Sequence, residues 1–169
     1  MSRNEYDDEP TAPIPASGVG AVVLDSACLA GVACNCEGRP ASALAVSAVA
    51  HWAAERGVRL VPVCPEVAGG LTTPRVVAER GGDGIVVTAG GDDVSDAYPR
   101  GADAAVALAG AIGATHAILK ARSPSCGCSG IYDGTFSHHL VPGRGVTAEA
   151  LIAAGVTVRS EEDLAEASQ

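Results

Sequence analysis

A repeated pairing of a predicted helix with an apolar run constrains the fold of this chain more than any other feature. The helical stretches cover residues 42–57, 95–113 and 147–155, and each ends at a glycine. The apolar runs VRLVPV, THAIL and VTV follow them. Glycine suits the left-handed position after a helix, and short β-branched runs are typical of a parallel sheet covered on both faces. With AVVLD as a first strand, the pattern predicts an α/β, Rossmann-like three-layer fold with a mainly parallel sheet.

The same periodicity indicates which helix faces are buried. Two apolar stripes have the i, i+3, i+4, i+7 spacing of a helix face: Val46, Val49, Ala50 and Ala53, and Ala105, Leu108, Ala109 and Ile112. The glycine-rich segment 78–95 interrupts the alternation and predicts a small hairpin or flap insertion. Residues 1–19 are acidic and proline-rich, which is typical of a disordered leader. We therefore expect one α/β domain over residues 20–169.

Charge and composition narrow the possible partners. The net charge is −9, and the two ends, residues 1–11 and 160–169, supply −7 of it. The body has no basic stripe that would follow a phosphate backbone, so duplex nucleic acid is not an expected partner. No apolar run reaches the roughly 18 residues of a spanning helix, and the N-terminus lacks an apolar signal segment. We expect a cytoplasmic protein without a membrane partner, in which thiols stay reduced.

Three of the six cysteines follow predicted strands. Cys28 comes after AVVLD, Cys64 after VRLVPV and Cys126 after THAILKA. Ligand sites in open α/β sheets form at the carboxyl ends of the strands, so these thiols are expected to meet in one composite site. Three cysteinates suit zinc or an iron–sulfur cluster, whereas buried structural thiols are the alternative. A closed shell needs a fourth ligand, for which the candidates are Cys34, Cys36, Cys128, His116, His138 and His139.

Five segments resemble, in order, the motifs of the thiouracil desulfidase family, which was formerly catalogued as a domain of unknown function. They are SACLAGVAC, VCPEVAGGLTTPR, ILKARSPSCG, IYDGTF and GVTAEALIAAGV, and they span about residues 21–160. The resemblance implies a [4Fe-4S] cluster held by three cysteines and the removal of sulfur from a thiolated uracil without net redox change. By motif, the ligands would be Cys28, Cys64 and Cys126, and the catalytic side chains Glu66 and Ser123. Such a protein would act on a small thiolated heterocycle and depend on cluster-assembly machinery.

The chain departs from the family pattern beside the first cysteine motif. Family members often read C-R-Y-D-G where this chain has CNCEG, so Asn35 and Cys36 replace an arginine and a tyrosine. Cys128 follows SPSCG, where a small polar residue is common. These departures leave the identity of the heterocycle, and the oligomeric state, open at the level of sequence.

The residues fit the hydrolytic desulfidation that the resemblance implies. A three-cysteine cluster leaves one iron open, and a soft thiocarbonyl sulfur would bind it and be polarised for attack by water. Glu66 would move protons, and Ser123 would relay one or hydrogen-bond the ring. The alternatives are a helix cap or an ion pair with Arg75 for Glu66, and a turn hydroxyl for Ser123. Lys120, Arg122 and Arg75 are candidate substrate-binding residues, although a basic pair at a strand end is more often structural.

Two other classes of function stay open on the sequence. One is a non-enzymatic metal-binding module whose ligands all come from protein. The other is a thiol-based sulfur carrier that uses the C-N-C or C-G-C array. Phosphate binding is weakly supported, because VAGGLTTPR lacks the lysine arrangement of a P-loop. Gly69 and Gly70 are instead expected to permit a tight backbone turn beside the thiols.

Overall fold

The computed structural model describes residues 20–166, so the predicted leader lies outside the described part of the chain. Its centre is a four-stranded sheet in the order β2-β1-β5-β8, with every neighbouring pair parallel. The strands are β1 (Val22–Ser26), β2 (Arg59–Val63), β5 (His116–Leu119) and β8 (Thr157–Ser160). β1 and β5 are central and almost fully buried, which explains why their sequences read as continuous apolar runs.

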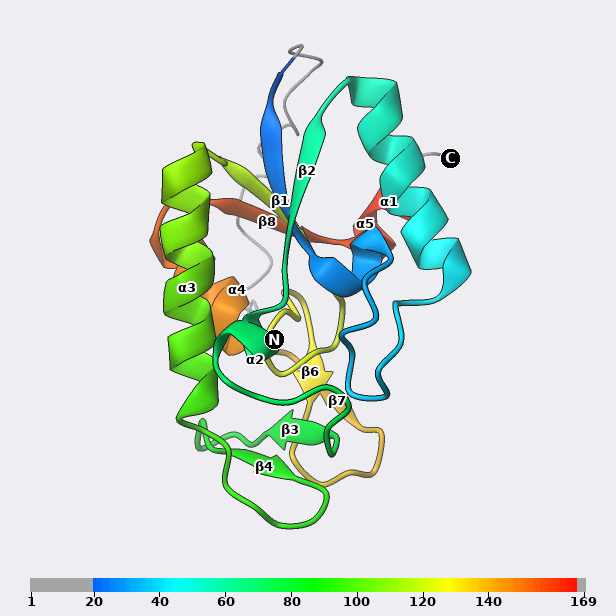
Figure 1. The fold of residues 1–169 in the computed structure, drawn as a ribbon. Coiled ribbons are helices and arrows are strands. Elements are labelled where there is room, and N and C mark those ends of the chain that lie inside the picture. Colours follow the sequence, from blue (N-terminus) through cyan, green and yellow to red (C-terminus); the bar gives the residue numbers. More distant parts are fainter. Residues whose placement is uncertain (1–19, 167–169) are drawn as a thin grey trace, which may run out of the picture.

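Helices cover both faces of this sheet (Figure 1). On one face, α3 (Ala97–Ile112) and α4 (Val146–Ala153) pack against Leu24, Ala117 and Leu119. On the other, α1 (Ala43–Arg56) and α5 (Glu161–Glu166) pack against Val23 and Ile118. Alternate residues of a strand point to opposite faces, so β1 and β5 each contribute to both cores. The predicted three-layer α/β fold is confirmed.

The helix ends follow the predicted glycine signals. Gly57, Gly113 and Gly155 have φ values of 62°, 68° and 85°, in the left-handed region that favours glycine. One predicted face is partly wrong: Ala50 is exposed, and Trp52 is buried instead, beside Val49 and Ala53. Burying an indole removes far more apolar surface from water than burying a methyl group, so the helix turns its tryptophan inward.

Two small hairpins lie beyond the carboxyl edge of the sheet (Figure 1). The predicted insertion forms β3 (Ala78–Arg80) and β4 (Val86–Thr88), which pair antiparallel. β6 (Ile131–Tyr132) and β7 (Leu140–Val141) form the second hairpin. The buried Glu79 carboxylate joins them, because its Oε2 accepts the backbone N–H groups of Gly134 at 3.0 Å and Phe136 at 2.9 Å. The hairpins therefore form one connected wall opposite the strand ends.

The remaining elements are short and follow β1 and β2. The 3-10 helix η1 (Ala27–Ala30) continues from β1, and α2 (Pro65–Ala68) begins two residues after β2. Within residues 20–166, no helix is long and apolar enough to cross a membrane.

Candidate active site

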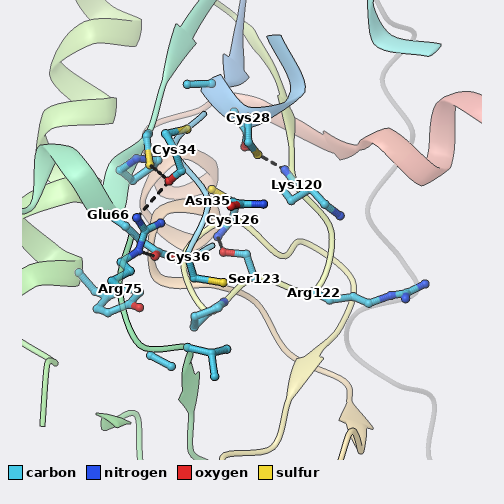
Figure 2. Close-up of a pocket in the computed structure, with 18 of the residues that line it drawn as sticks. Cys28, Cys34, Asn35, Cys36, Glu66, Arg75, Lys120, Arg122, Ser123 and Cys126 are labelled. Carbon is cyan, nitrogen blue, oxygen red and sulfur yellow. Dashed lines mark hydrogen bonds and ion pairs between the residues drawn. The ribbon is translucent and has the colours of Figure 1, made fainter. Parts of the chain in front are cut away.

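A cavity of about 350 Å³ lies at the carboxyl edge of the sheet, between the strand ends and the hairpin wall (Figure 2). The loops after β1, β2 and β5 line it, together with residues 75–78 and Tyr132 of the wall. All eight site residues predicted from the sequence line this cavity: Cys28, Cys64, Glu66, Arg75, Lys120, Arg122, Ser123 and Cys126. The strand order thus brings together side chains that are nearly 100 positions apart in the sequence.

The three predicted ligand thiols come from three different elements. Cys28 lies in η1, Cys64 directly precedes α2, and Cys126 lies in the turn after β5. Pro65 begins α2, where its missing N–H removes no hydrogen bond, and the Cys64 side chain makes no capping bond. The Cys64 thiol is therefore left facing the cavity. The structure brings the three thiols to one cavity, and their roles as ligands remain predictions.

Burial favours the protonated form of two of these thiols, those of Cys28 and Cys126, when nothing positive is bound. It raises the pKa of Cys28 from 9.0 to about 12, and the nearby Cys126 and Cys34 add to the increase. It also raises the pKa of Cys126 to about 12, against hydrogen bonds from Ser26 and Ser125 that lower it. A metal centre would supply the positive charge that turns such thiols into thiolates.

A fourth thiol, that of Cys34, belongs to the same group. Its pKa is raised to about 12. Burial is the largest cause, and the charge and the hydrogen bond of Cys64 also raise this pKa. The Cys64 thiol also donates to the backbone oxygen of Cys34 at 3.8 Å. Cys36 lines the cavity as well. Of the other fourth-ligand candidates, none of Cys128, His116, His138 and His139 is among the residues that line this cavity within the described chain.

Glu66 and Arg75 form a nearly buried ion pair on one side of the cavity. Arg75 Nε donates to Glu66 Oε2 at 2.6 Å, and the two side chains are only 10% and 14% exposed. Arg75 Nη1 also donates to the backbone oxygen of Cys34 at 3.0 Å. The pKa of Arg75 is raised, since burial lowers it but the charge and hydrogen bond of Glu66 act more strongly in the opposite direction. The ion pair considered from the sequence is present, and it holds the Glu66 carboxylate at the cavity wall.

Ser123 organises the turn that carries Cys126. Its Oγ accepts the backbone N–H groups of Ser125 and Cys126, both at 3.1 Å. This is the turn role considered from the sequence. A hydroxyl that accepts two hydrogen bonds still has its own proton to donate. Ser123 also lines the cavity, so that proton is available to a bound molecule.

The basic side chains after β5 are already paired with α5. Lys120 Nζ donates to Glu161 Oε1. The other oxygen of the same carboxylate, Oε2, accepts the backbone N–H of Ala121 at 2.7 Å. Arg122 pairs with Glu162 at 2.6 Å, and its guanidinium extends away from the thiols (Figure 2). A substrate-binding role for Lys120 and Arg122 remains a prediction. In the structure, their ion pairs attach the loop that leads to Cys126 to α5.

Two residues near these loops are not predicted from the sequence. Tyr98 of α3 lines the cavity, and no motif marks it. Asp25 ends the predicted strand AVVLD, where a carboxylate in an apolar run is a signal that could have been used. It is 0% exposed, and neither of its carboxylate oxygens has a hydrogen-bond partner within the described residues 20–166. Burial raises its pKa from 3.8 to about 7.

The thiols are gathered but do not converge on a single point. Within residues 20–166, no three Cys, His, Asp or Glu side chains lie close enough together to share one metal ion. The arrangement is therefore a sulfur-lined cavity with a carboxylate, a hydroxyl and a phenol on its walls.

Comparison with known proteins gives three matches over most of the chain. A family model described as 2-thiouracil desulfurase matches residues 23–163. The protein YbbK of Bacillus subtilis (strain 168) is 41% identical over 158 residues, which cover 85% of this chain and 97% of YbbK. The solved structure of the [4Fe-4S]-dependent thiouracil desulfidase TudS superposes with a TM-score of 0.76 at 40% identity, over 88% of this chain and 95% of that one.

Proposed function

This chain belongs to the 2-thiouracil desulfurase family, and on that basis we propose that it removes sulfur from a thiolated pyrimidine with a [4Fe-4S] cluster. The overall reaction converts C=S and water into C=O and hydrogen sulfide, so no electrons are gained or lost. The cluster would be held by Cys28, Cys64 and Cys126, with one iron left open for the substrate. The observation that carries the proposal is the meeting of these three thiols in one cavity with Glu66 and Ser123.

The cavity suits an iron–sulfur cluster in its donor atoms. All the candidate ligands are thiols, the side chains that clusters require. In a cluster each cysteine binds a different iron, so the ligands need not converge on one point as they do around zinc. When bound, the cluster supplies an open iron that acts as a Lewis acid toward a soft thiocarbonyl sulfur.

Glu66 is proposed to move protons during the attack of water. Its carboxylate lies two residues from Cys64, lines the cavity and has Oε2 engaged by Arg75. That contact fixes the carboxylate and leaves Oε1 for a water molecule or a ring N–H. Glu66 would take a proton from the attacking water and deliver one to the ring.

Ser123 is proposed to hydrogen-bond the ring or relay a proton. Its oxygen already accepts two backbone N–H groups, so the hydroxyl proton is oriented away from the turn. Because the same oxygen binds the N–H of Cys126, the proton donor and the proposed ligand are fixed relative to each other. A loss of Ser123 would therefore disturb both the ring contact and the turn.

The proposal is tested by reconstituting the protein anaerobically with iron and sulfide and assaying sulfide release from 2-thiouracil. We expect release of sulfide and formation of uracil in equal amounts, with no added reductant or oxidant. Protein that binds zinc, carries no acid-labile sulfide and turns over no thiolated base would instead be a metal-binding module.

The extra thiols separate the desulfidase from a thiol-based carrier. Cys36→Ser and Cys128→Ser should each leave iron content and sulfide release close to wild type, because neither is a proposed ligand. Activity that survives loss of Cys64 but not of Cys36 or Cys128 would favour the carrier.

A further inference from the structure

Tyr98 lies where α2 and α3 approach unusually closely. A Cβ atom at Gly69, just after α2, would lie 2.0 Å from the backbone oxygen of Ala97. A Cβ atom at Gly101 of α3 would lie 1.9 Å from the backbone oxygen of Pro65. Only glycine at both positions lets the two backbones touch. This contact brings the first turn of α3, with Tyr98, beside the short helix that carries Glu66.

The Tyr98 ring is anchored while its hydroxyl is available. The residue is 2% exposed, and its ring packs in a small core with Val86 and Ala97. Tyr98 nevertheless lines the cavity. Within residues 20–166, the Tyr98 hydroxyl makes no hydrogen bond. It is also not one of the fully buried polar atoms of this part of the chain that lack a partner. The hydroxyl therefore opens onto the cavity.

The surroundings of the hydroxyl keep it a neutral donor. Burial, and then the charge of Glu66, raise the pKa of the Tyr98 phenol well above its ordinary range. Arg75 lowers this pKa in part, while Cys126 and Cys36 are the other groups near enough to raise it. A neutral phenol beside a carboxylate and thiols is matched by an uncharged acceptor on a ligand, such as a ring carbonyl oxygen.

We propose that Tyr98 is a specificity-determining residue whose hydroxyl donates a hydrogen bond to the ring oxo oxygen of the thiolated pyrimidine. This inference rests on the proposed function, in which the substrate sulfur lies at the thiol-lined end of the cavity. Tyr98, which belongs to α3, lines that end of the cavity close to Cys126 and to the ion pair of Glu66 with Arg75. A pyrimidine with its sulfur among the thiols then presents its oxo group to the anchored phenol. A ring without an oxo group leaves the hydroxyl without a partner.

The test compares Tyr98→Phe with wild type on two substrates. 2-Thiouracil has a ring oxo oxygen, and pyrimidine-2-thione has the same thiocarbonyl without it. In the reconstituted holoenzyme, the substitution should lower kcat/KM for 2-thiouracil by about 3- to 10-fold, the range of one neutral hydrogen bond. The value for pyrimidine-2-thione should change by less than about twofold on the same argument. Iron content and thermal stability should stay at wild-type levels, because no hydrogen bond within the protein is lost.

A second substitution and a binding measurement make the result decisive. Val49→Ala creates a cavity in the opposite core, so it should lower stability without changing the ratio between the two substrates. Calorimetric titration of the same ligands into the holoprotein needs no turnover. If wild type releases no sulfide, the proposed function fails, while titration still decides whether Tyr98 recognises the oxo group. Equal losses for both ligands, or no loss for 2-thiouracil, would overturn the inference.

Discussion

At the scale of single residues, Glu66 is the side chain whose chemistry can be separated from cluster binding. Glu66→Gln keeps the size and hydrogen-bonding ability of the side chain but removes the base. We expect the variant to retain its iron and to bind 2-thiouracil, while turnover falls by about 10²–10⁴-fold, the usual scale for a positioned acid–base group. The measurements are iron content and the rate of sulfide release on the same preparation.

Cys64→Ser is the matched control two residues away. It should lose both iron and activity, because a hydroxyl is a poor substitute for a thiolate on iron. Normal turnover by Glu66→Gln with its cluster intact would show that Glu66 serves only as the ion-pair partner of Arg75. The proton path would then run through Ser123 or water.

Asp25 makes stability depend on pH in a direction that follows from its burial. Its pKa is raised from 3.8 in the unfolded chain to about 7 in the fold. The folded state therefore holds this proton more tightly, so the stability that Asp25 contributes is fully present below pH 3.8 and is lost as pH rises through about 7. At about 1.4 kcal/mol per pKa unit, the loss is on the order of 4 kcal/mol.

The Asp25→Asn variant isolates that contribution. An amide of the same shape cannot ionise, so urea unfolding at a series of pH values should show a flatter profile than wild type between pH 4 and 7. Asp103→Asn, at an exposed position of α3, should keep the wild-type profile. Parallel profiles for Asp25→Asn and wild type would mean that Asp25 is hydrated or paired in solution.

Single residues also show what the sequence can and cannot predict of the site. Cys28, Cys64 and Cys126 were placed correctly because each follows a strand, and the carboxyl ends of parallel strands share an edge. Tyr98 could not be found this way, since it reaches the cavity through the packing of α2 against α3 rather than through a strand end. The ion pair of Glu66 with Arg75 is an alternative that the sequence allows, but its burial depends on tertiary structure.

At the scale of elements, the contact between α2 and α3 is expected to be sensitive to one methyl group. Gly101→Ala places a Cβ atom 1.9 Å from the backbone oxygen of Pro65, so one helix must shift. We expect the free energy of unfolding to fall by about 1–3 kcal/mol or more, the scale of overpacking. Iron content should fall as well, because α2 adjoins Cys64. Denaturant unfolding and iron analysis measure the two effects.

Gly110→Ala is the control on the same helix. Apart from its chain neighbours and the backbone of its own helix, no atom of the described residues lies within 4 Å of a Cβ at this position, and its φ is not positive. The substitution should stabilise α3 by about 0.5–1 kcal/mol, because alanine has the higher helix propensity. Equal effects of the two substitutions would show that the close approach of α2 and α3 does not govern stability.

The elements themselves were largely predictable, and their connections were not. Helix ends at Gly57, Gly113 and Gly155 follow from a conformation that glycine adopts most easily. The apolar spacing selects Ala50 rather than Trp52 for the buried face, because helix spacing alone does not weigh the size of side chains. The contacts of Glu79 with the second hairpin and of Glu161 with the Cys126 loop join segments distant in sequence, and local patterns carry no signal for them.

At the scale of the whole molecule, the parallel sheet gathers the thiols and the hairpins close the space opposite them. Three strand ends supply Cys28, Cys64 and Cys126, and the wall joined by Glu79 supplies Ala78 and Tyr132. The sheet is specified by repeated local signals, whereas the cavity depends on two hairpins that contact each other. The fold therefore fixes where chemistry can occur, and the insertions shape what can enter.

The central claim is that three cysteines hold a cluster whose remaining iron is open to the substrate. Mössbauer spectroscopy of protein reconstituted with ⁵⁷Fe tests it most directly, using Glu66→Gln to slow turnover. The account predicts about four irons per chain, of which one differs from the others and alone changes when 2-thiouracil is added. Four equivalent irons that do not respond to 2-thiouracil would contradict it and would indicate a shell closed by a fourth thiolate, for which Cys34 is in position.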